Sequence, residues 1–293
     1  MGIILGLAGA VCWGVADFLA RFSSRRVGAY RTLLFMQAFG FVGISAYLQW
    51  THGFTKISAH GWQPWAFGAI AGFVNMIASL ALYYSFQIGV MSVVAPVSSS
   101  YPALTVMLAL LSGERVQMLR GVGLAVTLVG VVLASTSFTT DKVDAPADGG
   151  HPHARLAKGV VWAIAAAVGF GFLFWFLGFH VVPVLGSVIS VWMIRLTSFT
   201  VLILAAAPSR QTIKLPRGSV WWLLLGVGLL DTAAFVFNNA GLRAGQVSVV
   251  SVLASLYGAV TVVLSWIFLR ERLERSQWLG IALIFAGIVL VSY

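Results

Sequence analysis

Three charged side chains lie inside long apolar stretches of this sequence: Asp17, Arg195 and Asp231. A charge at the centre of a bilayer costs roughly 2.5–3.5 kcal/mol on insertion scales, so each of them needs a partner or a function. Asp17 precedes Arg21 by four residues, which favours an ion pair along one helical face over binding of a substrate or a proton. Asp231 has two open interpretations, a carboxylate that binds a proton or an amine and a structural pair with Arg195.

A proline-containing stretch carries the second group of polar residues. Pro96 and Pro102 each remove a backbone donor and free the carbonyl oxygen four residues earlier. In a membrane such carbonyls need partners, and either neighbouring serines such as Ser98 or a substrate ammonium could supply them. Tyr101 and its repeat counterpart Tyr257 each offer a ring and a hydroxyl, either for packing between helices or for substrate contact.

Amides and aromatic rings complete the candidate site. Asn75 occupies the position of Asp231 in an internal repeat, and Asn239 follows Asp231 by about two helical turns. Apolar walls for a substrate are available from rings, most of which simply pack in any bundle, at Trp13, Phe170, Phe174, Trp175 and Phe235. The predicted substrate-binding set is Trp13, Asp17, Asn75, Ser98, Tyr101, Phe170, Asp231, Asn239 and Tyr257, with Asp17 a marginal member.

The internal repeat organises the chain. Residues 92–111, SVVAPVSSSYPALTVMLALL, recur in altered form as residues 248–267, SVVSVLASLYGAVTVVLSWI, at an offset of 156. One inserted residue later, Glu114-Arg115 meets Glu271-Arg272. Matches spread over this length are not explained by shared apolar composition alone, so we interpret the chain as a duplication.

The composition predicts a membrane protein. Hydrophobic residues make up 60% of the chain and charged residues 9%, and the mean hydropathy is +0.96, values outside the soluble range. The net charge of +10 is scattered between apolar runs and forms no basic face for nucleic acid. The single cysteine, Cys12, excludes an internal disulfide. No metal, cofactor or enzyme motif is present, so we expect no cofactor, no metal and no enzymatic activity.

Ten apolar runs are long enough to cross a bilayer: 3–22, 31–50, 65–86, 90–112, 118–137, 159–179, 186–207, 219–242, 246–269 and 276–293. A polar linker, 139–158, separates a first five-helix repeat, 1–138, from a second, 159–293. Because five is odd, the second repeat enters the membrane from the opposite side. The predicted fold is therefore an all-α membrane protein with ten transmembrane helices as two inverted five-helix repeats.

Lysine and arginine predict the orientation of the chain. Loops after odd-numbered runs hold thirteen of these residues and the opposite side holds four. Since positive loops stay in the cytoplasm, this bias places both termini outside.

The segments Ser112-Gly113-Glu114-Arg115 and Leu269-Arg270-Glu271-Arg272, each followed by spaced glycines, resemble those of the EamA-type drug/metabolite transporter superfamily. The resemblance covers nearly the whole chain. Tyr101-Pro102 and Asn239 are also similar to the YddG-type aromatic amino-acid exporters. The resemblance implies export of small metabolites, amino acids among them, from a central cavity, and it implies cytoplasmic termini, against the charge count.

Together these features predict a secondary transporter of the bacterial inner (plasma) membrane that exports amino acids by alternating access. The expected partners are a small-molecule substrate and membrane lipid, without nucleic acid, and the expected state is a monomer. A multidrug or other metabolite exporter of the same fold and a channel are the alternatives.

Overall fold

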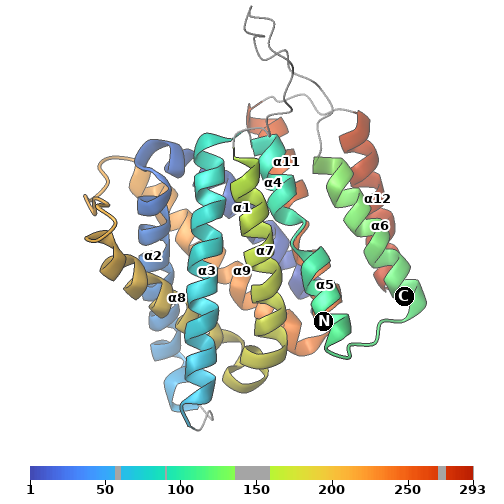
Figure 1. Cartoon of the computed structure of the whole chain (residues 1–293), viewed down its shortest axis with the longest axis horizontal. Coiled ribbons are helices and arrows are strands. Elements are labelled where there is room, and N and C mark those ends of the chain that lie inside the picture. Colours follow the sequence, from blue (N-terminus) through green and yellow to red (C-terminus); the bar gives the residue numbers. More distant parts are fainter. Residues whose placement is uncertain (57–60, 90, 136–158, 270–274, 293) are drawn as a thin grey trace, which may run out of the picture.

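The computed structural model describes residues 1–56, 61–89, 91–135, 159–269 and 275–292, and every regular element within these ranges is helical (Figure 1). The elements are α1 (Gly2–Val27), α2 (Ala29–Trp50), the short 3₁₀ helix η1 (Gly53–Lys56), α3 (Gln63–Ile88), α4 (Met91–Ser99), α5 (Pro102–Leu111), α6 (Met118–Ser135), α7 (Val160–Phe176), the π-helical segment η2 (Leu177–Val181), α8 (Val182–Ala206), α9 (Val220–Ala244), α10 (Val247–Ala254), α11 (Tyr257–Leu269) and α12 (Arg275–Ser292). The predicted linker 139–158 lies outside the described residues.

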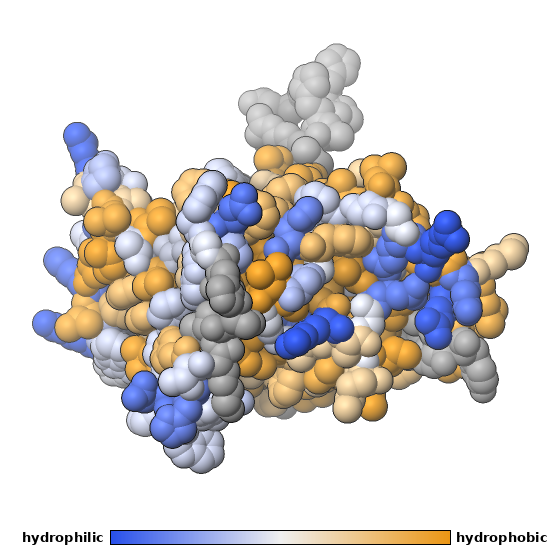
Figure 2. Space-filling model, turned by 90° about the horizontal axis from the view of Figure 1, so that it is seen from below, coloured by the Kyte–Doolittle hydropathy of each residue, from blue (hydrophilic) through white to orange (hydrophobic). Residues whose placement is uncertain are grey.

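Within the described ranges, six helical segments are long and apolar enough to span a membrane: Gly2–Val27, Ala29–Trp50, Gln63–Ile88, Val160–Ala206, Val220–Ala244 and Val247–Phe268. Large apolar side chains such as Val11, Phe73 and Leu204 are exposed on the sides of the bundle, where lipid would cover them. Seen from the end where the N-terminus lies, hydrophilic side chains form separate patches among hydrophobic ones (Figure 2). The all-helical membrane architecture is confirmed, and the count of ten spans stays a prediction.

Two predicted runs are each divided into two helices. The run 90–112 breaks between α4 and α5, where Pro102 begins the second helix because its ring cannot continue the first. The run 246–269 breaks between α10 and α11 without a proline. At both breaks a serine hydroxyl binds a carbonyl oxygen three residues earlier, from Ser100 to Val97 at 2.7 Å and from Ser255 to Val252 at 2.7 Å.

The expected connection at 180–185 is helical instead. The helix continues from α7 through η2 into α8, and the bend falls at Gly186, whose φ of 75° and ψ of 171° are not helical. A positive φ is open to glycine without steric cost. Gly28, with φ 87° and ψ 156°, separates α1 from α2 in the same way. The chain therefore turns at single glycines where the apolar pattern suggested longer loops.

Equivalent positions of the two repeats make equivalent contacts across the halves. Thr105 of α5 donates a hydrogen bond to the carbonyl of Gly171 in α7 at 2.9 Å, and Thr261 of α11 donates to the carbonyl of Gly14 in α1 at 3.2 Å. In Figure 1 the chain begins at the lower end, whereas α7, the counterpart of α1, begins at the upper end. The central elements of each half thus pack against the first helix of the other half.

Small residues permit this close packing. A Cβ added to Gly14 would lie 3.0 Å from the carbonyl oxygen of Tyr257, and one added to Gly171 would lie 2.9 Å from that of Tyr101. Both distances are shorter than ordinary van der Waals contact. The two glycines therefore fix how closely the broken helices approach α1 and α7, and so they position the tyrosines at the start of each second half-helix.

Candidate functional site

A small cavity of about 30 Å³ lies where the two halves meet. Its walls come from α1, α3, α7, α9, α11 and the residue before α5, and every side chain in them is buried. The lining residues are Trp13, Asp17, Ser79, Leu82, Tyr83, Tyr101, Phe170, Phe174, Asp231, Phe235 and Tyr257. Six of the nine predicted site residues are among them.

Aromatic rings form most of the wall. The ring centroid of Trp13 lies 5.1 Å from that of Phe235 in an edge-on arrangement and 5.4 Å from that of Phe174. Tyr101 lies 4.9 Å from Phe174 and stacks on Tyr257 at 6.3 Å with 12° between the planes. Such offset and edge-on pairs hold rings rigidly, so the cavity has a firm apolar surface.

The two repeats contribute to this wall symmetrically. Trp13 lies 6.4 Å from Tyr257 at 69°, and its repeat counterpart Phe170 lies 6.4 Å from Tyr101 at 66°. Each tyrosine hydroxyl donates to the opposite half: Tyr101 to the carbonyl of Ser251 at 3.0 Å and Tyr257 to the Oγ of Ser98 at 3.3 Å. The tyrosine hydroxyls thus join the halves, and their rings face the cavity.

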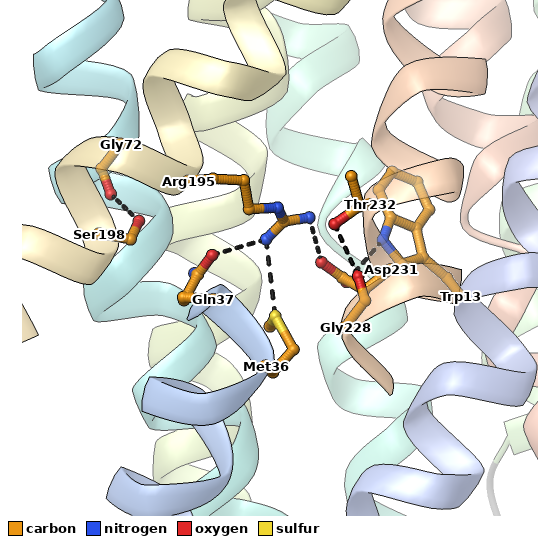
Figure 3. A network of polar contacts seen from close by, with 9 residues as sticks. All are labelled: Trp13, Met36, Gln37, Gly72, Arg195, Ser198, Gly228, Asp231 and Thr232. Carbon is orange, nitrogen blue, oxygen red and sulfur yellow. Dashed lines mark hydrogen bonds and ion pairs between the residues drawn. The ribbon is translucent and has the colours of Figure 1, made fainter. Parts of the chain in front are cut away.

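Asp231 is held in a buried polar network (Figure 3). Nη2 of Arg195 donates to its Oδ2 at 2.5 Å, and the indole Nε1 of Trp13 donates to its Oδ1 at 3.0 Å. The other guanidinium nitrogen, Nη1, donates to Oε1 of Gln37 at 2.8 Å, and Cζ lies 5.0 Å from the ring centre of Phe235. Of the two interpretations of Asp231, the structure shows the pair with Arg195.

Asp17 differs from Asp231 in having no such partner among the described residues. It lies in α1 with 4% of its surface exposed and lines the cavity. Within the described part of the chain the ion pair joins Arg195 and Asp231, so the expected pairing of Asp17 along α1 is wrong, because its side chain points into the bundle. When both aspartates are ionised, two negative charges and the single positive charge of Arg195 leave the site with one net negative charge.

Two hydroxyls on α3 were not predicted from the sequence. Ser79 and Tyr83 line the cavity, and among the described residues neither hydroxyl has a hydrogen-bond partner. Four-residue spacing from Asn75 along α3 leads first to Ser79 and then to Tyr83, so helical periodicity was the available signal. Leu82 completes this wall.

Three predicted residues do not line the cavity. Ser98 accepts from Tyr257 and donates to the carbonyl of Ala95 at 2.9 Å, so it lies behind the tyrosine pair. Asn239 reaches the carbonyl of Ser187 at 3.5 Å. Asn75 is fully buried, and the described residues offer its amide no partner.

Of the other rings considered, Phe174 and Phe235 belong to the wall, whereas Trp175 lies outside it and donates to Ser112 Oγ at 2.8 Å. No group of three or more metal-ligating side chains occurs among the described residues. The site is therefore an aromatic chamber in which one carboxylate on α1 and two hydroxyls on α3 have no hydrogen-bond partner among the described residues.

Comparisons with known proteins agree with this architecture. The model of the EamA-like transporter family matches residues 1–136 and again residues 157–293. The chain is 22% identical over 227 residues to an uncharacterized transporter of Archaeoglobus fulgidus, covering 76% of this chain and 73% of that protein. It is 30% identical over 136 residues to an uncharacterized protein of Methanocaldococcus jannaschii, covering 46% of this chain and 96% of that protein.

A solved crystal structure superimposes with a TM-score of 0.73 at 17% identity, covering 99% of this chain and 96% of the other. At 17% sequence identity, this similarity is evidence for a shared fold. The family match is more informative, because it occurs twice and includes both halves of the duplication. The protein is thus a multi-pass membrane transporter of small metabolites built from two repeats, and it belongs to the EamA-like transporter family.

Proposed function

We propose that this protein is a secondary transporter that exports amino acids, aromatic ones among them, across the bacterial inner (plasma) membrane by alternating access. The observation that carries the proposal is the aromatic chamber between the halves, with the Asp17 carboxylate on one wall and the Ser79 and Tyr83 hydroxyls on another. Its volume of about 30 Å³ is below the roughly 300–1,000 Å³ of pockets for small molecules, so in this proposal the surrounding helices move apart when the substrate binds.

In this proposal each part of an amino acid has a matching group. The ammonium binds Asp17, with the faces of the surrounding rings adding cation–π attraction. The carboxylate accepts hydrogen bonds from Ser79 and Tyr83, and the side chain packs against Phe170 and its neighbours. Asp231 remains paired with Arg195 and holds the Trp13 ring in place.

In the same proposal, three buried residues contact the substrate at a later step of transport: Asn75, Ser98 and Asn239. They lie behind the present wall, and we expect them to meet the substrate after the helices move. Such movement is the reason that carriers place binding groups on broken helices near the midplane, and α4–α5 and α10–α11 are two such pairs.

The proposal of alternating access is based on the internal duplication. We propose ten spans in two inverted repeats, 1–138 and 159–293, joined by the linker 139–158. The matching contacts of Thr105 and Thr261 support the exchange of equivalent conformations between the halves. The thirteen-to-four distribution of lysine and arginine between the two sides supports termini outside the cytoplasm. The resemblance to the aromatic amino-acid exporters implies the opposite, cytoplasmic termini.

Counterflow tests this function. The purified protein is placed in liposomes loaded with an unlabelled aromatic or aliphatic amino acid, and uptake of the labelled form is followed. Saturable, transient accumulation is expected, because a carrier exchanges internal for external substrate and a channel does not. Absence of accumulation for every amino acid, with folded protein in the vesicles, would refute amino-acid transport.

A second candidate is an exporter of organic cations. It is favoured by the two aspartate carboxylates beside a single arginine and by the aromatic wall of the chamber, the combination that recognises alkylammonium groups. Competition of counterflow by lipophilic cations more strongly than by amino acids would support this candidate over the first.

A further inference from the structure

A larger groove lies on the outside of the bundle, separate from the central cavity. Its volume is about 720 Å³, and none of its lining residues belongs to the cavity. Its walls are the joint between α1 and α2, one face of α3, the first turns of α7 and two residues between α8 and α9. In Figure 1 this is the upper end, where α3 ends beside the start of α7.

The side walls of the groove are apolar. Ile77, Leu80 and Tyr84 follow one another at helical spacing along α3, and Ile77 is 51% exposed. Trp162 of α7 faces them, with its ring centroid 5.1 Å from that of Tyr84 in an edge-on arrangement. Exposed apolar side chains in a membrane bundle face acyl chains, and Tyr and Trp rings are typical of the interfacial zone. This part of the groove therefore suits a hydrocarbon chain.

The end of the groove beside the α1–α2 joint is polar and positive. Gly28 leaves the first turn of α2 open, since a Cβ there would meet nothing within 4 Å. The amide of Ala29 donates to Oε1 of Gln87 at 2.9 Å, but the amides of Tyr30 and Arg31 find no acceptor among the described residues. The first turn of this 22-residue helix also contains no acidic residue.

Arg31 adds a full positive charge at the same place. Its Nη2 donates to the carbonyl of Lys214, while its buried Nε has no partner in the described part of the chain. Among the residues that the structure describes, no aspartate or glutamate lines the groove. The predicted cytoplasmic side, to which this end belongs, holds thirteen of the seventeen lysines and arginines assigned to loops, so the local field favours an anion.

We infer that this groove binds an anionic phospholipid of the surrounding bilayer. The phosphate lies against Arg31 and the open first turn of α2, since helix N-termini and guanidinium groups both bind phosphate oxygens. One acyl chain lies along Ile77, Tyr84 and Trp162. The inference does not depend on the transported substrate.

Bound lipid would press on elements that also form the chamber. On α3 the groove residue Tyr84 is next to the cavity residue Tyr83, and α7 carries both Trp162 and Phe170. The lipid would also lie against Gly28, the single-residue joint between two long helices. An anionic lipid at this position would therefore stabilise the present arrangement of α1, α2, α3 and α7.

Quenching of tryptophan fluorescence by brominated lipid tests the inference. The full chain is reconstituted in phosphatidylcholine vesicles that contain equal mole fractions of either dibrominated phosphatidylglycerol or dibrominated phosphatidylcholine. The fluorescence of Trp162 alone is obtained by subtracting the signal of the Trp162→Phe variant from that of the unmodified chain. We expect phosphatidylglycerol to quench Trp162 at a lower mole fraction than phosphatidylcholine does.

Two variants and one control locate the charge. Arg31→Gln should reduce the preference for phosphatidylglycerol about fivefold, the effect of one basic residue at an anionic membrane surface. Gln211→Glu, at an exposed groove position, should reduce it similarly without removing the bond to Lys214. Arg26→Gln removes the same charge from an exposed position outside the groove and should leave the preference unchanged.

Equal quenching by the two lipids in the unmodified chain would overturn the inference. So would equal effects of Arg31→Gln and Arg26→Gln, because the preference would then reflect only the general charge of this end. Relief of quenching by millimolar inorganic phosphate would also overturn it, by indicating a site for a free anion. Persistence of quenching in phosphate is the expected result.

Discussion

The buried pair of Arg195 and Asp231 makes the sharpest prediction about stability. Arg195 is fully buried, and replacing it with methionine leaves the Asp231 carboxylate with the indole of Trp13 as its hydrogen-bond donor. Removing one partner of a buried pair costs roughly 3–5 kcal/mol, because the other charge remains without compensation. For a chain of this size that corresponds to a fall in the unfolding midpoint on the order of 10 °C.

The assay is thermal unfolding of the purified protein in one detergent, followed by circular dichroism. Arg26→Met removes a charge from an exposed position and should change stability by less than about 0.5 kcal/mol. The double variant Arg195→Met, Asp231→Leu should recover most of the loss, because no buried charge is then left unpaired. The reasoning is refuted if Arg195→Met unfolds within about 2 °C of the unmodified protein, or if the effects of the two substitutions simply add.

Three further predictions concern the chamber and its supports. Asp17→Asn should reduce counterflow at least about tenfold, as expected for loss of a charged contact, while the unfolding midpoint is kept; unchanged counterflow would remove Asp17 from the site. Gly171→Ala should destabilise by about 1–3 kcal/mol, because the new methyl group meets the carbonyl of Tyr101. The control Gly121→Ala has open space and should be neutral or slightly stabilising in the same melt. Tyr101→Phe and Tyr257→Phe should each cost about 1–3 kcal/mol, and a large effect of only one would contradict their equivalence.

The duplication explains how much of the fold was predictable. A repeat with an offset of 156 residues, together with apolar runs of membrane length, indicates the class, the division and the equivalence of Tyr101 and Tyr257. The turns were harder to predict. Gly28 and Gly186 each reverse the chain with a single residue of positive φ, and apolar periodicity alone does not distinguish such a glycine from one inside a helix.

The chamber was only partly predictable for a different reason. Charge in an apolar run identified Asp17 and Asp231, but the choice of partner depends on how α1, α8 and α9 are rotated about their axes. That rotation brings Arg195 to Asp231 and turns Asp17 inward. On α3 the polarity of Asn75 was visible in the sequence, whereas the next turns, with Ser79 and Tyr83, form the wall.

The central claim is that Asp17 binds the amine of a transported amino acid, and competition of counterflow tests it most directly. Counterflow of labelled phenylalanine is measured against rising concentrations of 2-phenylethylamine, which keeps the amine, and of 3-phenylpropionate, which keeps the carboxylate. We predict that the amine competes far better than the acid in the unmodified protein and that Asp17→Asn abolishes this difference. Stronger competition by the acid, or an unchanged preference in Asp17→Asn, would contradict the account.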